Sequence, residues 1–119
     1  MEDQLNISVE RKSEFTVVAI YGSVNMMDVD DFRKKLLSTI ESEQGQDLII
    51  DLSAMTFINS LGLGVLVTAQ REMKRVQHRL KLVHPQAEVQ KMLETTKLTR
   101  LFAIYPDVDS AMAAAQAPG

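Results

Sequence analysis

Short apolar runs and helical stripes of apolar residues alternate along most of the chain. Runs rich in β-branched, aliphatic or aromatic residues predict five strands, at residues 5–10, 15–21, 47–52, 80–83 and 101–104. Apolar positions spaced three or four residues apart predict helices at residues 28–42, 60–77, from Pro85 onward, and 107–115. The elements therefore alternate between strand and helix after an initial pair of strands.

This order predicts an α/β fold, in which about four helices pack against a mixed sheet of four to five strands. Arg11, Lys12 and Ser13 suit a hairpin turn between the first two strands. A chain of 119 residues is long enough for one domain with one core. We expect that domain to span residues 1–115 and to be followed by a disordered tail at 116–119.

The junction between the strand at 47–52 and the helix from Ser60 carries the strongest signal of function. The small residues Asn59, Ser60, Gly62 and Gly64 interrupt the apolar pattern there. The first backbone N–H groups of a helix are unpaired and its dipole is positive at that end, so a phosphoryl group is well tolerated. Ser60 is therefore both a candidate N-cap and a candidate phosphorylation site.

Composition narrows the classes of function. The formal net charge is −3, which disfavours a dedicated nucleic-acid-binding domain, and the chain has no cysteine for disulfides, thiolate chemistry or Cys-based zinc sites. No apolar run reaches the roughly 18 residues that span a bilayer, and the polar N-terminal segment does not resemble a secretory signal. We expect a cytoplasmic protein without direct membrane insertion, and nothing in the pattern indicates a cofactor or a metal site.

Two segments of the chain match a known family. Residues 51–53 (Asp-Leu-Ser) and 57–66 (Phe-Ile-Asn-Ser-Leu-Gly-Leu-Gly-Val-Leu) resemble the central motif of STAS domains of the anti-sigma factor antagonist type. Residues 22–25 (Gly-Ser-Val-Asn) are similar to the segment that precedes the first helix in that family. The likeness extends over nearly the whole chain.

The resemblance implies a partner-switching function without catalysis. Ser60 would be phosphorylated by a serine kinase that is itself the anti-sigma factor, and a PP2C-type phosphatase would restore the hydroxyl group. The unphosphorylated protein would bind the kinase and thereby release the sigma factor. We expect the partner to contact Asn25, Met26, Asn59, Ser60, Leu61 and Gly62.

The chain departs from the family pattern at three positions. Asn25 and Asn59 stand where aspartates are usual, and Leu61 replaces a common small polar residue. Two fewer carboxylates mean less repulsion of a phosphoserine, which carries about −1.5 to −2 charges. Residue 25 is expected to lie near the serine. Leu61 would give a protein interface a large apolar side chain, and Met26 and Met27 would either fill the core or a loop or form an adaptable contact surface.

Two alternatives remain open on these residues. A STAS subunit that contacts an ATPase of a membrane transport complex would use the same surface without phosphorylation. An enzyme or nucleotide-binding domain would use the loop around Gly62 and Gly64, but the pattern lacks a third glycine or a Gly-Lys-Ser/Thr sequence. Close packing of the helix start against the sheet is the simpler explanation of both glycines. His78 and His84 match no catalytic spacing.

Overall fold

The fold is built on a mixed sheet with the strand order β1-β2-β3-β4-β5. The computed structural model describes residues 4–43 and 45–114. β1 (Asn6–Lys12) pairs antiparallel with β2 (Phe15–Val24), whereas β3 (Asp47–Ile58), β4 (Leu80–Val83) and β5 (Ala103–Tyr105) continue the sheet in parallel. The predicted α/β class and mixed sheet are confirmed. The disordered tail predicted at 116–119, and residue 115 of the predicted domain, lie outside the described residues.

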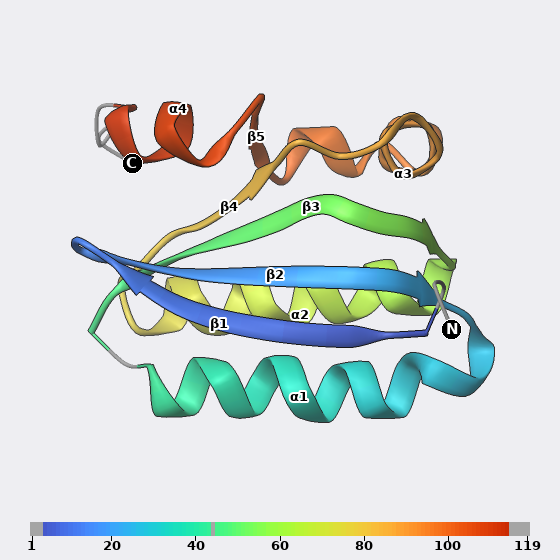
Figure 1. Ribbon diagram of the computed structural model, residues 1–119, viewed down its shortest axis with the longest axis horizontal. Coiled ribbons are helices and arrows are strands. Elements are labelled where there is room, and N and C mark those ends of the chain that lie inside the picture. The colour runs from blue at the N-terminus through green and yellow to red at the C-terminus, as the bar shows by residue number, and fades with distance from the viewer. Residues whose placement is uncertain (1–3, 44, 115–119) are drawn as a thin grey trace.

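The helices cover the two sheet faces unequally. They are α1 (Val29–Ser42), α2 (Ser60–Arg75), α3 (Ala87–Thr95) and α4 (Val108–Ala113), with short 3-10 turns η1 (Met26–Asp28) and η2 (Leu98–Arg100). Figure 1 shows α1 and α2 side by side along the sheet, α3 beside β3, and α4 near β4 and β5. The main core joins the sheet to α1, α2 and α3, and a smaller cluster joins the opposite face to α4.

β3 displays this division within one strand. Leu48, Ile50 and Leu52 belong to the main core, whereas the intervening Ile49 belongs to the cluster under α4. All four side chains are buried because helices cover both faces of this part of the sheet. This explains why the sequence shows a continuous apolar run here and not an alternating one.

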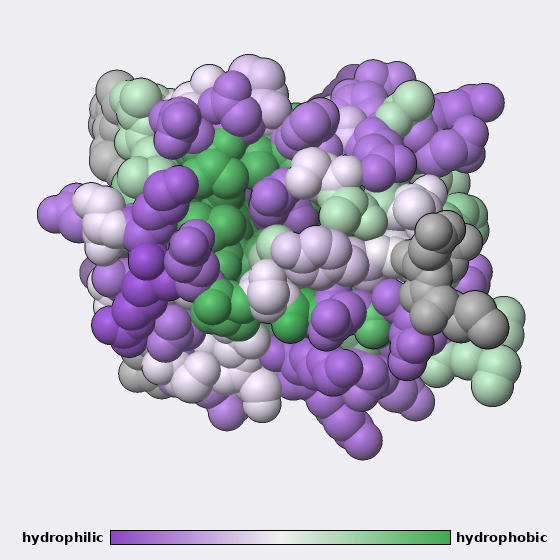
Figure 2. Space-filling view, viewed as in Figure 1, coloured by the Kyte–Doolittle hydropathy of each residue, from purple (hydrophilic) through white to green (hydrophobic). Residues whose placement is uncertain are grey.

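The face that carries α4 is only partly covered. Beyond α4, a hollow of about 570 Å³ lies against β1 and β2. Val17, Ala19, Tyr21 and Val108 are among its lining residues, together with polar side chains of β1. Figure 2 shows apolar atoms on this face of the molecule, bordered by more hydrophilic residues.

Several predicted boundaries are wrong. β1 continues through Arg11 and Lys12, so the hairpin turn consists of Ser13 and Glu14, with Ser13 at a φ of 60°. Pro85 does not open α3, which begins at Ala87 after Gln86 in extended backbone. Gln77, at a φ of 65°, lies beyond the end of α2 at Arg75. Each error concerns an end of an element, where one backbone angle decides the outcome.

The largest difference concerns the length of β3. The strand predicted at 47–52 continues to Ile58, because β2 also extends to Val24 and the two strands remain paired to their ends. The pairing register of the parallel ladder shifts between Ala19 and Tyr21 and again between Gly22 and Ser23, yet the two strands stay paired to Val24 and Ile58. The extension carries the chain directly to Asn59 and Ser60.

Candidate functional site

The paired ends of β2 and β3 bring two distant parts of the sequence together. Val24 pairs with Ile58, and the backbone N–H of Asn59 donates a 3.1 Å hydrogen bond to the carbonyl of Val24. The residues that follow, Asn25 and Asn59, therefore lie at the same edge of the sheet, and Ser60 comes next. The expected proximity of residue 25 to the serine is confirmed.

Asn59, and not Ser60, is the N-cap of α2. The Asn59 side-chain Oδ1 accepts a 2.7 Å hydrogen bond from the backbone N–H of Gly62, and Asn59 itself has extended backbone angles. Ser60 is the first residue of the helix. The prediction that Ser60 caps the helix is wrong, because asparagine is an equally good cap and stands one residue earlier.

This arrangement leaves the Ser60 hydroxyl group free. Ser60 is exposed, and within residues 4–43 and 45–114 its side chain forms no hydrogen bond. The group stands at the N-terminal end of α2, where the helix dipole is positive. An added phosphoryl group would meet solvent and would not displace a packed side chain.

The two glycines of the first turn and a half have different environments. A Cβ atom at Gly62 would lie 2.7 Å from Ile58 Cγ1 and 3.0 Å from Val24 Cγ1, so the glycine allows α2 to pack against the ends of β2 and β3. A Cβ atom at Gly64 would meet nothing within 4 Å. The packing explanation is confirmed for Gly62 and wrong for Gly64, which faces outward.

The segment after β2 is held by its own polar groups. The backbone N–H of Asn25 donates to Asp28 Oδ2 at 2.9 Å, and the Asn25 Nδ2 group donates to Ser23 Oγ at 2.9 Å. These contacts close η1 and direct its two methionines outward. Met26 is 76% exposed and Met27 is 95% exposed, so the prediction that they fill the core is wrong and their position suits a contact surface.

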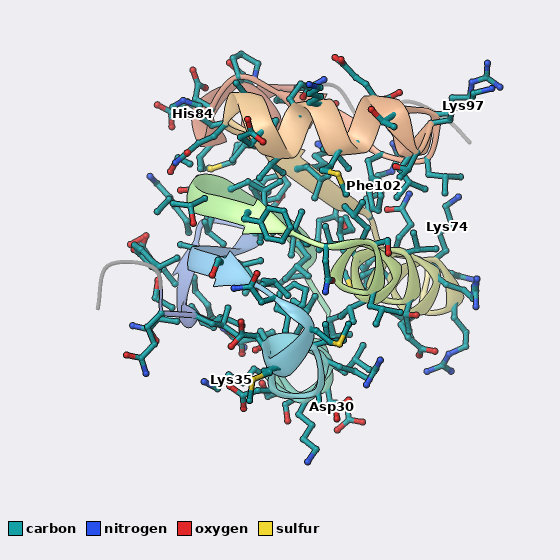
Figure 3. The ribbon with its side chains drawn as sticks, turned by 90° about the vertical axis from the view of Figure 1, so that its right-hand side faces the viewer. Asp30, Lys35, Lys74, His84, Lys97 and Phe102 are labelled. Atoms are coloured by element: carbon teal, nitrogen blue, oxygen red, sulfur yellow. The ribbon has the colours of Figure 1, made fainter. Side chains whose placement is uncertain are left out.

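Four large apolar side chains are exposed at this edge of the sheet. Met26 and Met27 lie in η1, Phe57 lies near the end of β3, and Leu61 lies in the first turn of α2, where it is 56% exposed. We refer to these four residues as the apolar patch. Figure 3 views the molecule from this side, with the ends of β2 and β3 near its centre. Exposed apolar side chains at the same end of the sheet as a free hydroxyl group are suited to contact with another protein.

Sequence reasoning identified Met26 and Leu61 but did not include Met27 and Phe57 among the binding residues. Met27 is exposed because it lies in the 3-10 turn η1. The predicted helix begins at Asp28, so its pattern does not indicate where the side chain of the preceding residue points. Phe57 belongs to the family motif, but the predicted strand ends at residue 52, so the prediction gives Phe57 no place on a strand and no exposed face. A prediction that β2 and β3 extend together to Val24 and Ile58 would have placed both residues at the binding surface.

Other candidate residues lie elsewhere. The side chain of His78 pairs with Asp47 at the opposite end of β3, with 3.1 Å between Nδ1 and Oδ1. His84 is exposed, and its backbone N–H donates to the carbonyl of Tyr105. In the described part of the chain, no three His, Asp or Glu side chains are grouped so that they could hold a metal ion. Nor does any helix there have the length and apolarity needed to cross a bilayer.

The family model described as STAS domain matches residues 6–111 of this chain. The chain belongs to the STAS domain family. The Bacillus subtilis anti-sigma-B factor antagonist is 28% identical over 100 residues, which cover 84% of this chain and 90% of that protein. This relative matches the functional class that the residue motif indicated.

Solved structures show the same fold. The crystal structure of an anti-sigma factor antagonist from Mycobacterium paratuberculosis has a TM-score of 0.85 at 23% identity, with 98% of both chains covered. The Bacillus protein SpoIIAA in its phosphorylated form has a TM-score of 0.67 at 20% identity, with 90% of this chain and 96% of that chain covered. The STAS fold predicted from the residues is therefore confirmed over most of the chain.

Proposed function

We propose that this protein is an anti-sigma factor antagonist that acts by partner switching. In its unphosphorylated form it binds an anti-sigma factor, itself a serine kinase, and so releases a sigma factor in the cytoplasm. Phosphorylation of Ser60 ends the binding, and a PP2C-type phosphatase restores it. The domain acts through binding and performs no catalysis. One observation carries the proposal: the exposed Ser60 hydroxyl group, which forms no hydrogen bond in the described residues, lies at the same end of the sheet as the apolar patch.

The interface would consist of the expected site residues together with the two that the structure adds. Asn25, Asn59, Ser60, Leu61 and Gly62 form the junction between the strand ends and α2. The apolar patch lies at the same end of the sheet, and its exposed side chains would lose contact with water when a partner covers them, which favours binding. Gly62 contributes through the position it gives α2, since it is itself buried.

The physical effect of phosphorylation follows from this location. A phosphoserine carries about −1.5 to −2 charges and is strongly hydrated, so burying it against apolar partner groups is costly. In the free domain the same group faces water and the positive end of α2. A loss of about 3 kcal/mol in binding is sufficient to weaken affinity roughly a hundredfold. The domain stays folded while the complex dissociates.

The comparisons support this reading. Relatives that cover most of the chain are named as anti-sigma factor antagonists, and a protein of the same fold has been solved in a phosphorylated form. Asn25 and Asn59 carry amides and not carboxylates, so neither residue repels a phosphoryl group on Ser60. Asp28 is the nearest carboxylate of η1, and one of its oxygens is held by the backbone N–H of Asn25.

Mass spectrometry of the intact protein from its native host tests the proposal. We expect a fraction of the wild-type protein to carry one phosphate, and the phosphate to be absent from Ser60→Ala but present in Ser42→Ala. Ser42 is an exposed serine at the far end of α1 and serves as a matched control. The kinase that labels Ser60 is then purified, and its affinity for each form is measured by calorimetry.

Two results would contradict the proposal. Protein that never carries phosphate under several growth conditions, and that co-purifies with a transporter ATPase, would favour the second candidate, a STAS subunit of a transport complex. If the kinase bound the phosphorylated and unphosphorylated forms with equal affinity, the two proteins would form a complex, but phosphorylation of Ser60 would not control it.

A further inference from the structure

The outward face of α2 contains a glycine that the fold does not require. Ser60, Gly64, Thr68 and Arg71 recur at helical spacing along this face, and Gly64 is exposed in the helix interior. Its backbone is ordinary, because the only glycines with positive φ in the described residues are Gly22 and Gly45. A Cβ atom at Gly64 would meet nothing within 4 Å. Alanine would therefore fit without strain.

Glycine here acts against helix stability. An exposed glycine inside a helix is less favourable than alanine, because the unfolded chain has more freedom to lose. One turn later the Thr68 hydroxyl group donates to the Gly64 carbonyl at 3.1 Å, an arrangement that competes with regular helix geometry. Residues that oppose local stability without a structural reason tend to serve a function.

The surroundings of Gly64 indicate what that function is. Leu61, one turn earlier in α2, is 56% exposed. Met27 in η1, which follows the end of β2 at the same end of the sheet, is 95% exposed. On the other side of Gly64, Arg71 and Lys74 are exposed, and neither forms an ion pair with any described residue. Figure 3 shows Lys74 projecting from the outer side of α2. Gly64 thus lies on an exposed helix face, between the apolar side chain of Leu61 and two positive charges that form no ion pair in the described residues.

We propose that Gly64 is the point at which an α-helix of the partner crosses α2, and that its missing side chain determines which partners fit. Helix axes normally lie 8 to 10 Å apart, at a distance set by the side chains at the contact, so a glycine allows a closer crossing. The partner helix would place apolar side chains against Leu61 and Met27 and carboxylates near Arg71 and Lys74. This inference rests on the proposed function, since it names a residue of the same binding surface.

The crossing point also connects Gly64 to regulation. Ser60 lies one turn before Gly64 on the same helix face, so its phosphoryl group would project where the partner helix must pass. An acidic partner would be repelled by the added negative charge as well as displaced by its bulk. The closeness of the helices, which Gly64 permits, is what makes one phosphate effective.

Substitution at Gly64 separates binding from folding. The variants are Gly64→Ala and Gly64→Leu, and the matched controls are Ser38→Ala and Ser38→Leu at an exposed position of α1. We expect Gly64→Ala to raise the midpoint of thermal unfolding by roughly 4 °C. Titration with the purified serine kinase should show about tenfold weaker binding for Gly64→Ala and at least hundredfold for Gly64→Leu. Arg71→Ala should weaken binding less at high salt than at low salt.

The outcomes distinguish this inference from the proposed function. Kinase affinities of both Gly64 variants within twofold of wild type would overturn the inference and leave the proposed function intact. A wild-type protein that binds no kinase in either phosphorylation state would overturn both. Weakened binding that also occurs in the Ser38 variants would overturn the inference, because it would be unrelated to the α2 crossing.

Discussion

The two ends of β3 use their side chains in opposite ways. At the end that begins with Asp47, charged and polar groups are paired: Asp47 Oδ1 lies 3.1 Å from both His78 Nδ1 and the backbone N–H of Arg79. At the end that leads to Ser60, large apolar side chains are exposed and the serine hydroxyl group is free. One end of the sheet is closed by its own contacts, whereas the other end is left open to contact.

The closed end joins several elements that are far apart in the sequence. The Arg11 guanidinium of β1 lies 3.2 Å from the Glu43 carboxylate beyond α1, and these contacts raise the pKa of Arg11 above its ordinary value. Thr16 Oγ1 donates to Gln46 Oε1 at 2.8 Å beside the start of β3. Polar contacts that tie chain segments together stabilise a fold, whereas exposed apolar groups offer free energy only to a partner. The difference predicts where mutations affect stability and where they affect binding.

Among variants that remove a side chain, the largest expected effect is on binding at the open end. Replacing Leu61 with Ala should weaken binding of the serine kinase by about 2 kcal/mol, or roughly thirtyfold, because a buried leucine side chain contributes that much to an interface. The free energy of unfolding should change by less than about 0.5 kcal/mol, since the side chain is half exposed in the free protein. Calorimetric titration and urea unfolding measure the two quantities. Val76→Ala, an exposed apolar residue at the closed end, should change neither.

Gly62→Ala tests the packing below the open end. The added Cβ would lie 2.7 Å from Ile58 Cγ1, so either α2 or β3 must move. We expect a loss of about 2 kcal/mol in the free energy of unfolding, as is typical of overpacked sites. Urea unfolding followed by circular dichroism measures it, with Gly64→Ala as the matched glycine that should gain stability. Equal stability of the two variants would show that α2 is not seated on β3 as described.

Asp47→Ala should produce a somewhat smaller loss at the closed end. Removing the carboxylate leaves the Arg79 N–H and the His78 ring without their acceptor, at a cost of about 1.5 kcal/mol in the free energy of unfolding. Asp47→Asn retains an acceptor oxygen and should recover part of this loss. Kinase affinity should stay unchanged for both variants. A change in kinase affinity would show that the Asp47 end of β3 influences binding at the Ser60 end, which would contradict the separation of stability from binding.

The sequence predicts a structural element well where a pattern extends over several residues. It does not predict features that depend on a single tertiary contact. Alternating runs and helical stripes identified the five strands and four α-helices of the described residues, because burial imposes a period on many positions at once, but not the short 3-10 turns η1 and η2. The length of β3 depends on its pairing with β2, and the residues near position 52 carry no local signal of that pairing. Its consequence, the proximity of Asn25 to Asn59, came only from a family resemblance.

Two site features show the same limit at the level of single residues. Asn59 and Ser60 are both favourable caps, and only backbone geometry decides that Asn59 holds this position. Gly62 and Gly64 are alike in sequence, yet one lies against Ile58 and the other faces open space. Their different roles depend on helix rotation relative to the sheet, which follows from packing far from the motif.

Asn59→Ala and Ser60→Ala form the next pair of tests. The first removes the acceptor of the Gly62 N–H and should lower the free energy of unfolding by about 1 kcal/mol. The second should change it by less than about 0.5 kcal/mol, because the exposed Ser60 hydroxyl group forms no hydrogen bond in the described residues. Asn59→Asp should retain the cap. Urea unfolding at neutral pH measures all three, and a larger loss in Ser60→Ala would restore the serine as the cap.

The smallest expected effect concerns a second helix cap, in α4, that depends on pH. Asp107 Oδ1 accepts a 2.7 Å hydrogen bond from the backbone N–H of Ser110, and this bond, with the Ser110 hydroxyl group, lowers the pKa of Asp107 below its ordinary value. A lowered pKa means that the folded state favours the carboxylate. The stabilisation is therefore complete above the unfolded-state pKa, about 3.9, and is lost as the pH falls through the lower folded-state value.

Hydrogen exchange separates this cap from that of α2. Lowering the pH below about 4 should reduce the protection of the Ser110 amide relative to the intrinsic exchange rate, because the protonated carboxyl group is a weaker acceptor. Protection of the Gly62 amide should not follow the same titration, since its acceptor Asn59 does not ionise. Asp107→Asn should remove the pH dependence at Ser110 and retain a cap. If both amides lost protection together in the wild type, global acid unfolding, and not the Asp107 cap, would be the cause.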